Sequence, residues 1–158
     1  MNPTNLALLI AELRRDENVR YVPYLDNAKP PNETVGAGHN LRVSPLPAGW
    51  TYPLSDKQVD QLLTGDLDET FLELNHSLPW WTSLDDVRQR VIANMCFNMG
   101  IGDLLDFHMT LAAMQSGEYT AAAADMEDSE WYGEVGDRAV RLCQAMATGV
   151  MPDEPAIA

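Results

Sequence analysis

Apolar residues recur at helical spacing near the start of the chain. Leu6, Leu9, Ile10 and Leu13 follow the three- and four-residue steps that place side chains on one face of a helix. The pattern stops near Glu17, where polar residues take over. We therefore expect a first helix over about residues 4–16, with Glu17 at or just past its end.

A longer helix is predicted from about residue 55. Ser55 is followed three positions later by Gln58, the arrangement of a capping box, in which each side chain bonds the other residue's backbone N–H. The residues that follow place one apolar stripe along this helix. The stripe consists of Val59, Leu62, Leu63, Leu67, Phe71 and Leu74.

The remaining C-terminal residues have helical patterns almost throughout. Ser83 and Asp86 repeat the capping spacing before a helix that Gly100 and Gly102 close. Further helical stretches cover residues 104–117, 119–133 and 137–149, separated by glycines. The tail, residues 150–158, is expected to fray.

Residues 21–50 have a different character. They contain five prolines and several glycines, which favour short strands and turns over helices. The whole pattern predicts an α+β fold in one domain, residues 1–158. We expect a small β-hairpin N-terminal lobe, about residues 15–65, and a larger all-helical C-terminal lobe, about residues 75–150 plus the N-terminal helix 4–16, joined by the long helix.

The net charge of the chain limits the kinds of molecule that it is expected to bind. The chain has 24 acidic against 10 basic residues, a formal charge of −14. A nucleic-acid groove or an anionic membrane surface needs Lys and Arg, so this balance argues against both. Two causes of the acidity stay open: a solvating acidic surface, which we favour, and adaptation to high salt. No apolar run is long enough to span a membrane.

Cysteines and short motifs give no sign of a cofactor. Cys96 and Cys143 lie within apolar helical patterns, so we expect buried, reduced thiols. No metal-ligand spacing, phosphate loop or nucleophile elbow is present, and we expect neither metal nor cofactor. The first residues lack the basic segment of a signal peptide, so we expect none.

The strongest candidate chemistry involves Glu17, Asp26 and Thr34. Cleaving a glycosidic bond requires one protonated carboxyl group for the leaving oxygen, and one ionised carboxylate that guides water or shields positive charge. Glu17 and Asp26 fit these roles, and Thr34 adds a hydroxyl on the following strand. The spacing by itself is a weak signal, because most such pairs in a chain with 24 acids are solvated surface.

The sequence around these residues carries a family resemblance. Residues 13–41, LRRDENVRYVPYLDNAKPPNETVGAGHNL, resemble the catalytic segment of the phage lysozymes of glycoside hydrolase family 24, the T-even phage lysozyme group. The similarity covers about residues 6–150. Its most specific parts are the Glu and Asp separated by eight residues, the T-V-G-x-G-H strand, and the N-M-x-F-N-M-G helix at residues 94–100.

The resemblance implies a lysozyme-like fold and a muramidase. Glu17 then corresponds to the general acid, Asp26 to the carboxylate that positions the attacking water, and Thr34 to a hydroxyl that helps to hold it. The bond cleaved would be the β-1,4 bond between N-acetylmuramic acid and N-acetylglucosamine. The family inverts configuration, so we expect the two carboxyl groups roughly 6.5 to 9.5 Å apart. Gly36 and Gly38 would let the strand backbone approach a sugar ring.

The resemblance also implies supporting and sugar-binding residues. His39 is expected to brace the hairpin through Asp66, and this pairing would raise the pKa of His39. Arg138 corresponds to a basic residue near the catalytic acid, whereas Arg141 is expected on the helix surface. The sugar-binding positions of the family fall on Asn40, Phe97, Thr110 and Asp125.

Several functional alternatives remain open. A non-catalytic wall-binding, virion or toxin component would have no need of the three catalytic residues, and a lytic transglycosylase would need only the acid. For a muramidase we expect a monomer with peptidoglycan glycan strands as its partner, and no nucleic acid or membrane insertion. Synthesised in a host cytoplasm without an export signal, it would reach the periplasm through a holin or a delivery machine.

Overall fold

The computed structural model describes residues 1–157, so Ala158, the last residue of the expected domain, lies outside the described residues. These residues form eight α-helices, a short 3-10 helix (η1) and a three-stranded antiparallel sheet, which is an α+β composition. The elements are α1 (Pro3–Glu17), β1 (Arg20–Leu25), β2 (Glu33–Gly36), β3 (His39–Asn40), α2 (Asp56–Ser77), η1 (Pro79–Ser83), α3 (Asp86–Met99), α4 (Ile101–Leu105), α5 (His108–Gln115), α6 (Tyr119–Glu127), α7 (Glu130–Val135) and α8 (Asp137–Thr148).

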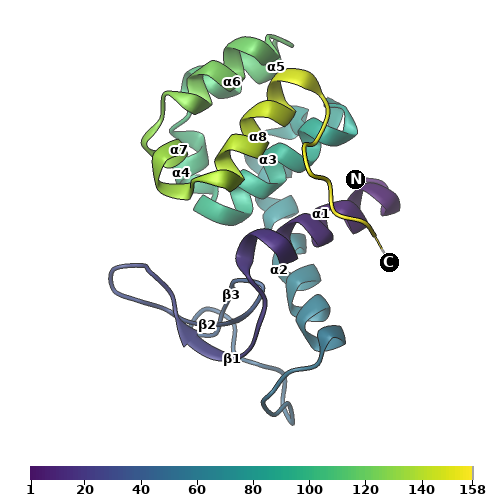
Figure 1. Ribbon diagram of the computed structural model, residues 1–158, viewed down its shortest axis with the longest axis vertical. Coiled ribbons are helices and arrows are strands. Elements are labelled where there is room, and N and C mark those ends of the chain that lie inside the picture. Colours follow the sequence, from purple (N-terminus) through teal and green to yellow (C-terminus); the bar gives the residue numbers. More distant parts are fainter. Residues whose placement is uncertain (158) are drawn as a thin grey trace.

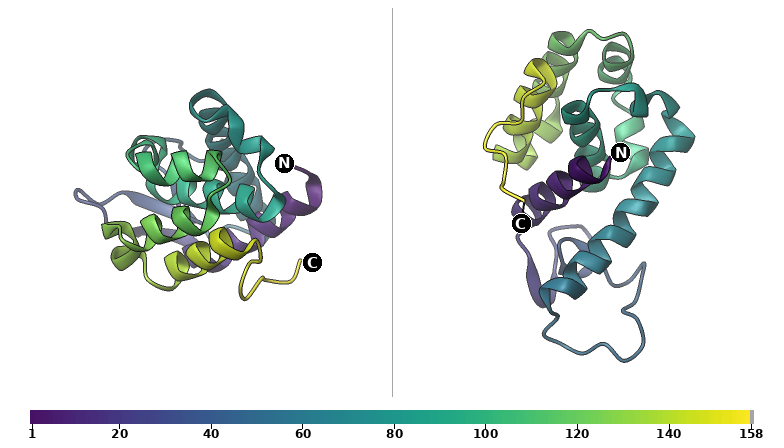
Figure 2. Two further views of the ribbon diagram at one scale, coloured as in Figure 1. Left: turned by 90° about the horizontal axis from the view of Figure 1, so that it is seen from above. Right: turned by 90° about the vertical axis from the view of Figure 1, so that its right-hand side faces the viewer.

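The sheet and most of the helices lie at opposite ends of an elongated molecule (Figure 1). The three strands and the connection that follows them form the lower end, while α3 to α8 are grouped at the upper end. The 22-residue α2 runs from the sheet toward the other helices, and α1 crosses it (Figures 1 and 2). No helix among residues 1–157 is both long and apolar enough to cross a membrane.

The structure confirms the end of the first helix. Asn2 caps α1 by accepting a hydrogen bond from the backbone N–H of Asn5, and Leu9 and Leu13 are fully buried. The helix ends at Glu17 because Asn18 takes a left-handed conformation with φ of 53°, which asparagine tolerates better than most residues. Glu17 is thereby placed where the chain turns from the helix into β1.

The capping box of α2 is also confirmed. The backbone N–H of Ser55 donates to Gln58 Oε1 at 2.9 Å, and the N–H of Gln58 donates to Ser55 Oγ at 3.1 Å. The apolar stripe faces the core, where Leu67 and Leu74 are fully buried. Local sequence signals therefore define the beginning and the orientation of this helix.

The sheet is small and has β2 at its centre. Thr34 of β2 pairs with Tyr24 of β1 on one side and with Asn40 of β3 on the other. An irregularity interrupts the pairing of β1 between Arg20 and Tyr24. The central position leaves Thr34 only 3% exposed.

The start of α3 differs from the sequence expectation. The N-cap of α3 is Asp85, whose carboxylate accepts from the N–H of Arg88 at 3.2 Å, and Ser83 instead ends η1. The amide of Gln89 fixes this turn by donating to the carbonyls of Thr82 and Leu84. Hydrogen bonds from one side chain to the preceding turn therefore select one of two acceptable caps.

Two of the expected helical stretches are each divided. The first becomes α4 and α5, with a break at Asp106 and Phe107, and the second becomes α6 and α7. Ser129 makes the second break by capping α7 through the N–H of Tyr132. The rings of Phe107 and Trp131 then meet edge to face, with centroids 6.3 Å apart, so the breaks serve packing between the short helices.

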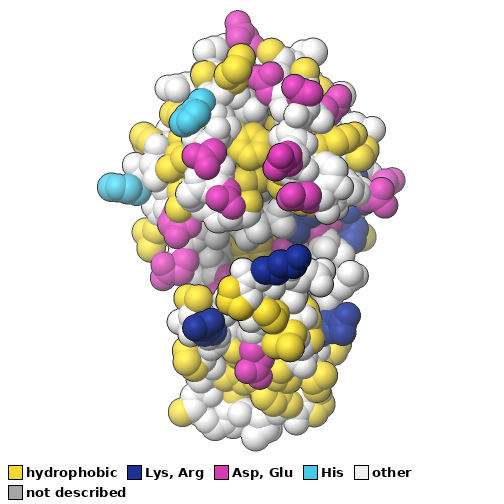
Figure 3. Space-filling view, turned by 90° about the vertical axis from the view of Figure 1, so that its left-hand side faces the viewer, with side chains coloured by type: hydrophobic (Ala, Val, Ile, Leu, Met, Phe, Trp, Pro, Cys, Tyr) yellow, Lys and Arg dark blue, Asp and Glu magenta, His cyan; other side chains and the backbone are white. Residues whose placement is uncertain are grey.

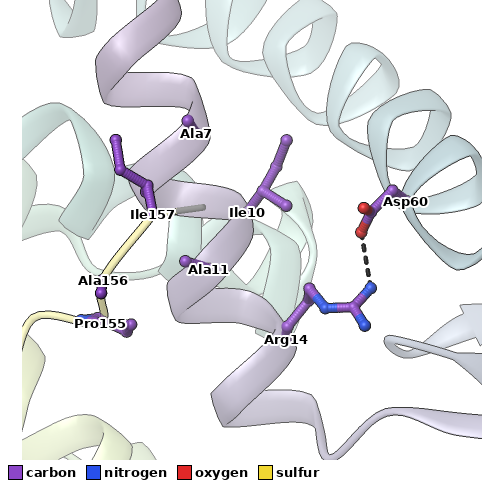
Figure 4. A pocket seen from close by; sticks show the side chains of 8 residues that line it. All are labelled: Ala7, Ile10, Ala11, Arg14, Asp60, Pro155, Ala156 and Ile157. Atoms are coloured by element: carbon purple, nitrogen blue, oxygen red, sulfur yellow. Dashed lines mark hydrogen bonds and ion pairs between the residues drawn. The ribbon is translucent and has the colours of Figure 1, made fainter. Parts of the chain in front are cut away.

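The C-terminal tail is packed, contrary to the expectation that it frays. Met151 is 6% exposed, and Glu154 accepts a hydrogen bond from the buried guanidinium of Arg90. Pro155, Ala156 and Ile157 lie beside α1 (Figure 4). An ion pair and apolar contact together hold a segment whose own sequence has no regular pattern.

Both cysteines are buried, free thiols, as the sequence predicts. Cys96 lies on α3 and Cys143 on α8. Burial raises the pKa of each thiol to about 12. Neither forms a thiolate to a useful extent at neutral pH.

Candidate active site

Glu17 lies where α1, the sheet and α8 meet. Its Oε1 accepts a hydrogen bond from Arg138 Nη1 at 2.7 Å, and its side chain is 20% exposed. The other carboxyl oxygen, Oε2, faces Gly38: a Cβ atom added there would lie 3.1 Å from it. Gly38 also has a φ of +78°, a conformation that side chains disfavour. Glycine at position 38 therefore keeps space open beside Oε2.

Arg138 connects Glu17 to a buried polar cluster. Its Nε donates to Asn94 Oδ1 at 2.8 Å and lies 3.7 Å from Asp16 Oδ2. Arg141 was expected on the helix surface, but its Nη2 donates to Asp16 Oδ1 at 2.9 Å. The two arginines are one turn apart on α8, so they share Asp16. The cluster fixes the guanidinium that holds Glu17.

Asp26 follows β1 directly and is held by the loop before β2. Its Oδ1 accepts from the backbone N–H groups of Asn32, at 2.7 Å, and Ala28, at 3.0 Å. Its Oδ2 accepts from the side-chain amide of Asn32 at 3.2 Å. These donors, the Asn32 N–H first, lower the pKa of Asp26 below its usual value. The arrangement keeps Asp26 ionised at neutral pH.

The hydroxyl of Tyr24 is influenced by both candidate catalytic carboxylates, Glu17 and Asp26. Burial and the negative charges of Glu17 and Asp26 raise the pKa of the Tyr24 hydroxyl, against the influence of Arg20. The negative charges of both carboxylates therefore act in the same direction on this hydroxyl. Thr34 is the cross-strand partner of Tyr24, and its Oγ1 donates to the Asn32 carbonyl at 3.1 Å.

His39 and Asp66 lie together between the sheet and α2. His39 Nδ1 is 2.8 Å from Asp66 Oδ2, and its Nε2 is 2.7 Å from the Ser44 carbonyl. Two acceptors suit a doubly protonated imidazole. The hydrogen bond to Asp66 raises the pKa of His39. Stabilisation by this pair is accordingly complete below the unfolded pKa of about 6.5 and is lost as pH rises through the folded pKa.

Two adjoining cavities open beside Gly38. The smaller, of about 200 Å³, is lined by Gly38, Asn40, Asp66 and Phe97 among others. The larger, of about 930 Å³, extends between the segment 39–47 and the acidic face of α2, and also reaches Phe97. Asn40 Oδ1 is occupied by the backbone N–H groups at positions 42 and 43. Its amide NH₂ is the group left for a ligand.

The other two expected sugar-binding residues lie apart from these cavities. Thr110 is on α5 and only 3% exposed, and Asp125 is half-buried on α6. Neither lines the smaller or the larger cavity beside Gly38. Asn40 and Phe97 line the smaller cavity together, Thr34 is the cross-strand partner of Asn40, and Thr110 and Asp125 lie outside both cavities.

A further cavity of about 540 Å³ lies between α1 and the C-terminal tail (Figure 4). Ala7, Ile10 and Ala11 form its wall on α1, and Arg14 closes one end through its ion pair with Asp60 at 2.6 Å. It contains none of the candidate catalytic residues. Among residues 1–157, no group of three or more His, Cys, Asp or Glu residues is arranged to hold a metal ion.

Comparison with known proteins gives three informative relatives. No family model matches the sequence. The pre-baseplate central spike protein Gp5 of Enterobacteria phage T4 is 30% identical over 157 residues, which covers 87% of this chain but 27% of the spike protein. The probable T4-type lysozyme 1 of Dictyostelium discoideum is 31% identical over 71 residues, 45% of this chain and 42% of the relative.

The third relative matches almost end to end. The probable T4-type lysozyme 2 of Dictyostelium discoideum is 22% identical over 162 residues, covering 89% of this chain and 94% of the relative. The chain is a T4-type lysozyme-like protein. The family expected from the sequence is therefore confirmed. In this lysozyme-like chain, the match to the spike protein spans about a quarter of that protein.

Sequence reasoning missed several residues of the lysozyme-like site. Asp16 precedes Glu17 in the sequence, and Asn94 opens the N-M-x-F-N-M-G segment, but neither position signals a buried contact with α8. Asn32 was overlooked because its role depends on the shape of the β1–β2 loop. The one available signal was the three-residue spacing of Arg138 and Arg141 on one helix face.

Proposed function

We propose that the chain is a peptidoglycan hydrolase that cleaves the β-1,4 bond between N-acetylmuramic acid and N-acetylglucosamine. The observation that carries this proposal is the position of Glu17, whose Oε2 faces Gly38, a residue that also lines the smaller cavity. Asp26, the second carboxylate, shares the surroundings of Tyr24 with Glu17. Two of the relatives are named T4-type lysozymes, which supports the same activity.

The roles of the three residues follow from their contacts. Glu17 Oε1 is engaged by Arg138, so the proton for the leaving oxygen is carried by Oε2. Asp26 is held ionised by the loop and accepts a proton from the attacking water. Thr34 Oγ1 donates to a backbone carbonyl and has lone pairs left to accept a hydrogen bond from that water.

Sugar binding is assigned to the cavities beside Gly38. Phe97 provides an apolar surface for a sugar ring, and the Asn40 amide donates to a sugar oxygen. Thr110 and Asp125 keep their sugar-binding roles as predictions that rest on the resemblance. His39, Asp66 and Arg138 are assigned to structural support of the site.

The division into two lobes gives this site its setting. We assign about residues 15–65 to a sheet-bearing lobe and about residues 75–150, with the N-terminal helix, to a helical lobe, with α2 joining them and the glycan bound between. The protein acts as a monomer on the wall in the periplasm, after holin-type release or delivery by a larger assembly. One relative is named as a pre-baseplate central spike protein, and this name motivates the second route.

Digestion of purified peptidoglycan tests the proposal. Wild type should release reducing muropeptides, and Glu17→Gln should release none while its thermal unfolding remains cooperative. Glu33→Gln is the matched control, because Glu33 is an exposed acid on the same strand as Thr34 and should keep full activity. Activity retained in Glu17→Gln would refute the assignment.

Product masses separate the alternatives. Products lighter by one water, with an anhydro sugar, would identify a lytic transglycosylase instead. A wild-type protein that binds the wall and releases nothing would be a binding component. An Asp26→Asn variant distinguishes the two enzymes, since the hydrolase needs this carboxylate for its water and the transglycosylase does not.

A further inference from the structure

The excess of negative charge is concentrated in the C-terminal part of the chain. Residues 58–158 contain 18 acidic and four basic residues, whereas residues 18–57 contain three acidic and four basic residues. The latter segment comprises the whole sheet, its connection to α2 and the first residues of that helix. We call it the sheet end. The sheet end is slightly basic although the chain as a whole is strongly acidic.

The bases of the sheet end also differ from the other bases in their ion pairing. Six arginines pair with carboxylates, namely Arg14, Arg15, Arg88, Arg90, Arg138 and Arg141. Within residues 1–157, the four bases without an ion pair are all at the sheet end, and all four are exposed: Arg20, Lys29, Arg42 and Lys57. Arg20 lies over the Tyr24 ring at 4.9 Å, a contact that leaves its charge uncompensated. The sheet end thus carries the available positive charge.

Exposed apolar side chains gather at the same end. Five of the nine large hydrophobic residues that the structure exposes lie between positions 21 and 52. They are Tyr21 at 38%, Val22 at 52%, Leu25 at 67%, Val43 at 80% and Tyr52 at 43% exposed. Blue and yellow side chains accordingly dominate the lower half of Figure 3, while magenta acids are most numerous on the upper half. Isolated exposed apolar residues are ordinary, but here five of them share one end of the molecule with the four bases that have no ion pair.

We propose that the sheet end binds peripherally to the surface of an anionic phospholipid bilayer. Arg20, Lys29 and Arg42 contact lipid phosphates, and Val22 and Leu25 enter the boundary between head groups and acyl chains. The formal charge of −14 argued against binding to an anionic membrane surface. That argument assumes that the charge is distributed evenly over the molecule. Close to the bilayer, groups beyond one Debye length contribute little.

The apolar side chains decide between a lipid surface and an anionic wall polymer. A polymer of sugars and acidic groups would satisfy the cations but would give Val22 and Leu25 no apolar environment. A bilayer satisfies both, because partial insertion removes these side chains from water. The acidic helices then point away from the membrane, so repulsion fixes the orientation of the molecule on it.

This charge distribution predicts an unusual dependence on salt. The Debye length is about 30 Å at 0.01 M, about 10 Å at 0.1 M and about 3 Å at 1 M ionic strength. At low salt the distant acids repel the bilayer, and at high salt the nearby cations no longer attract it. Binding should therefore be strongest near 0.1 M, whereas a uniformly basic protein would bind more weakly at every increase in salt.

Co-sedimentation with vesicles tests the proposal. Wild type at about 0.1 M salt should sediment with vesicles of phosphatidylcholine mixed with phosphatidylglycerol and stay in solution with phosphatidylcholine alone. The triple variant Arg20→Gln/Lys29→Gln/Arg42→Gln should bind about a hundredfold more weakly, since each cation near an anionic surface contributes several-fold. Val22→Ser/Leu25→Ser should also weaken binding at about 0.1 M salt, because partial insertion of these side chains adds to the attraction between the cations and the lipid phosphates.

A second triple variant controls for net charge. Gln115→Glu/Thr120→Glu/Gln144→Glu changes the charge by the same amount at exposed positions of α5, α6 and α8, away from the sheet end. It should keep near wild-type binding, and circular dichroism checks that every variant is folded. Equal binding to both vesicle types, or equal losses in the two triple variants, would overturn the proposal. So would loss of binding to purified wall in the first triple variant with vesicle binding unchanged.

Discussion

Glu12 and Asp16 are two buried carboxylates on successive turns of α1, and they are treated in opposite ways. Asp16, 1% exposed, accepts hydrogen bonds from Arg15, Arg141 and Asn94, with Arg138 nearby. Although burial acts to raise it, the pKa of Asp16 is lowered by the Arg15 and Asn94 hydrogen bonds and the neighbouring positive charges.

Glu12 has fewer partners. Its Oε1 accepts from Arg90 Nε at 2.8 Å, its Oε2 is buried without a hydrogen-bond donor, and the residue is fully buried. Arg90 also donates to Asn5 and to Glu154, so its charge is shared. Burial raises the pKa of Glu12 to about 6, against the attraction of Arg90.

The difference shows that burial by itself does not decide whether a carboxylate is charged. The number of donors around each oxygen decides it, because every donor replaces part of the lost hydration. Asp16 has donors on both oxygens and stays ionised beside the candidate site, where its charge holds Arg138 and Arg141. Glu12 has a donor on only one oxygen. That donor is Arg90, which also pairs with Glu154 and so ties the tail to the core.

The largest expected effect comes from breaking the Asp16 cluster. Asp16→Asn should destabilise the fold by about 3 to 5 kcal/mol, because removing one member of a buried charge cluster leaves the others uncompensated. Denaturant unfolding at pH 7 measures the loss. Asp86→Asn is the control, since Asp86 is an exposed acid of α3 outside the cluster. Equal stability of Asp16→Asn and wild type would show that the arginines find other partners.

The pH dependence of Glu12 should be the next largest effect. Because its folded pKa is raised, Glu12 binds its proton more tightly in the folded protein, so stability falls as pH rises from about 4.5 to about 6. The loss is about 2 kcal/mol. Asp16 acts in the opposite direction: its lowered pKa gives stability above pH 3.8 that is lost under more acid conditions.

Glu12→Gln isolates this contribution. The variant should lack the decrease in stability between these pH values while keeping the acid unfolding that Asp16 causes. Unfolding curves recorded from about pH 2 to pH 7 for both proteins make the comparison, because the Asp16 contribution is lost only below pH 3.8. An unchanged slope in Glu12→Gln would assign the effect to another group.

The smallest effect should come from the tail. Glu154 is 41% exposed, so Glu154→Gln should lower the free energy of unfolding by less than about 1 kcal/mol. Hydrogen exchange should nevertheless become faster across residues 150–157, because the ion pair with Arg90 fixes that segment. Asp153→Asn, at the neighbouring exposed acid, should leave exchange unchanged. Exchange that is fast in wild type would contradict the packed tail.

Local signals in the sequence predicted the parts of the fold that depend on neighbours along the chain. The capping box at Ser55 and the apolar face of α2 were confirmed because both are made within one helix. The end of α1 at Glu17 was equally local. Ser83 misled because Asp85 offers an equivalent cap two residues later, and the side chain of Gln89 selects between them.

Contacts between distant residues could not be predicted in this way. Arg141 meets Asp16 across 125 positions and Arg90 meets Glu154 across 64, so neither pair leaves a periodic pattern. For the candidate site, the family resemblance supplied Glu17, Asp26 and Thr34, whereas the loop donors of Asp26 appeared only in the structure. Thr110 and Asp125 rest on the resemblance and lie away from the cavities beside Gly38.

The buried thiols make the chain convenient for labelling chemistry. Cys96 and Cys143 are its two cysteines, and their raised pKa values leave almost no thiolate for a maleimide to attack at neutral pH. A cysteine introduced at an exposed position would therefore take up a dye or nitroxide selectively without removing the native pair. Two such probes, one on the β1–β2 loop and one on α6, would allow the distance between the sheet and the helices to be measured by spectroscopy.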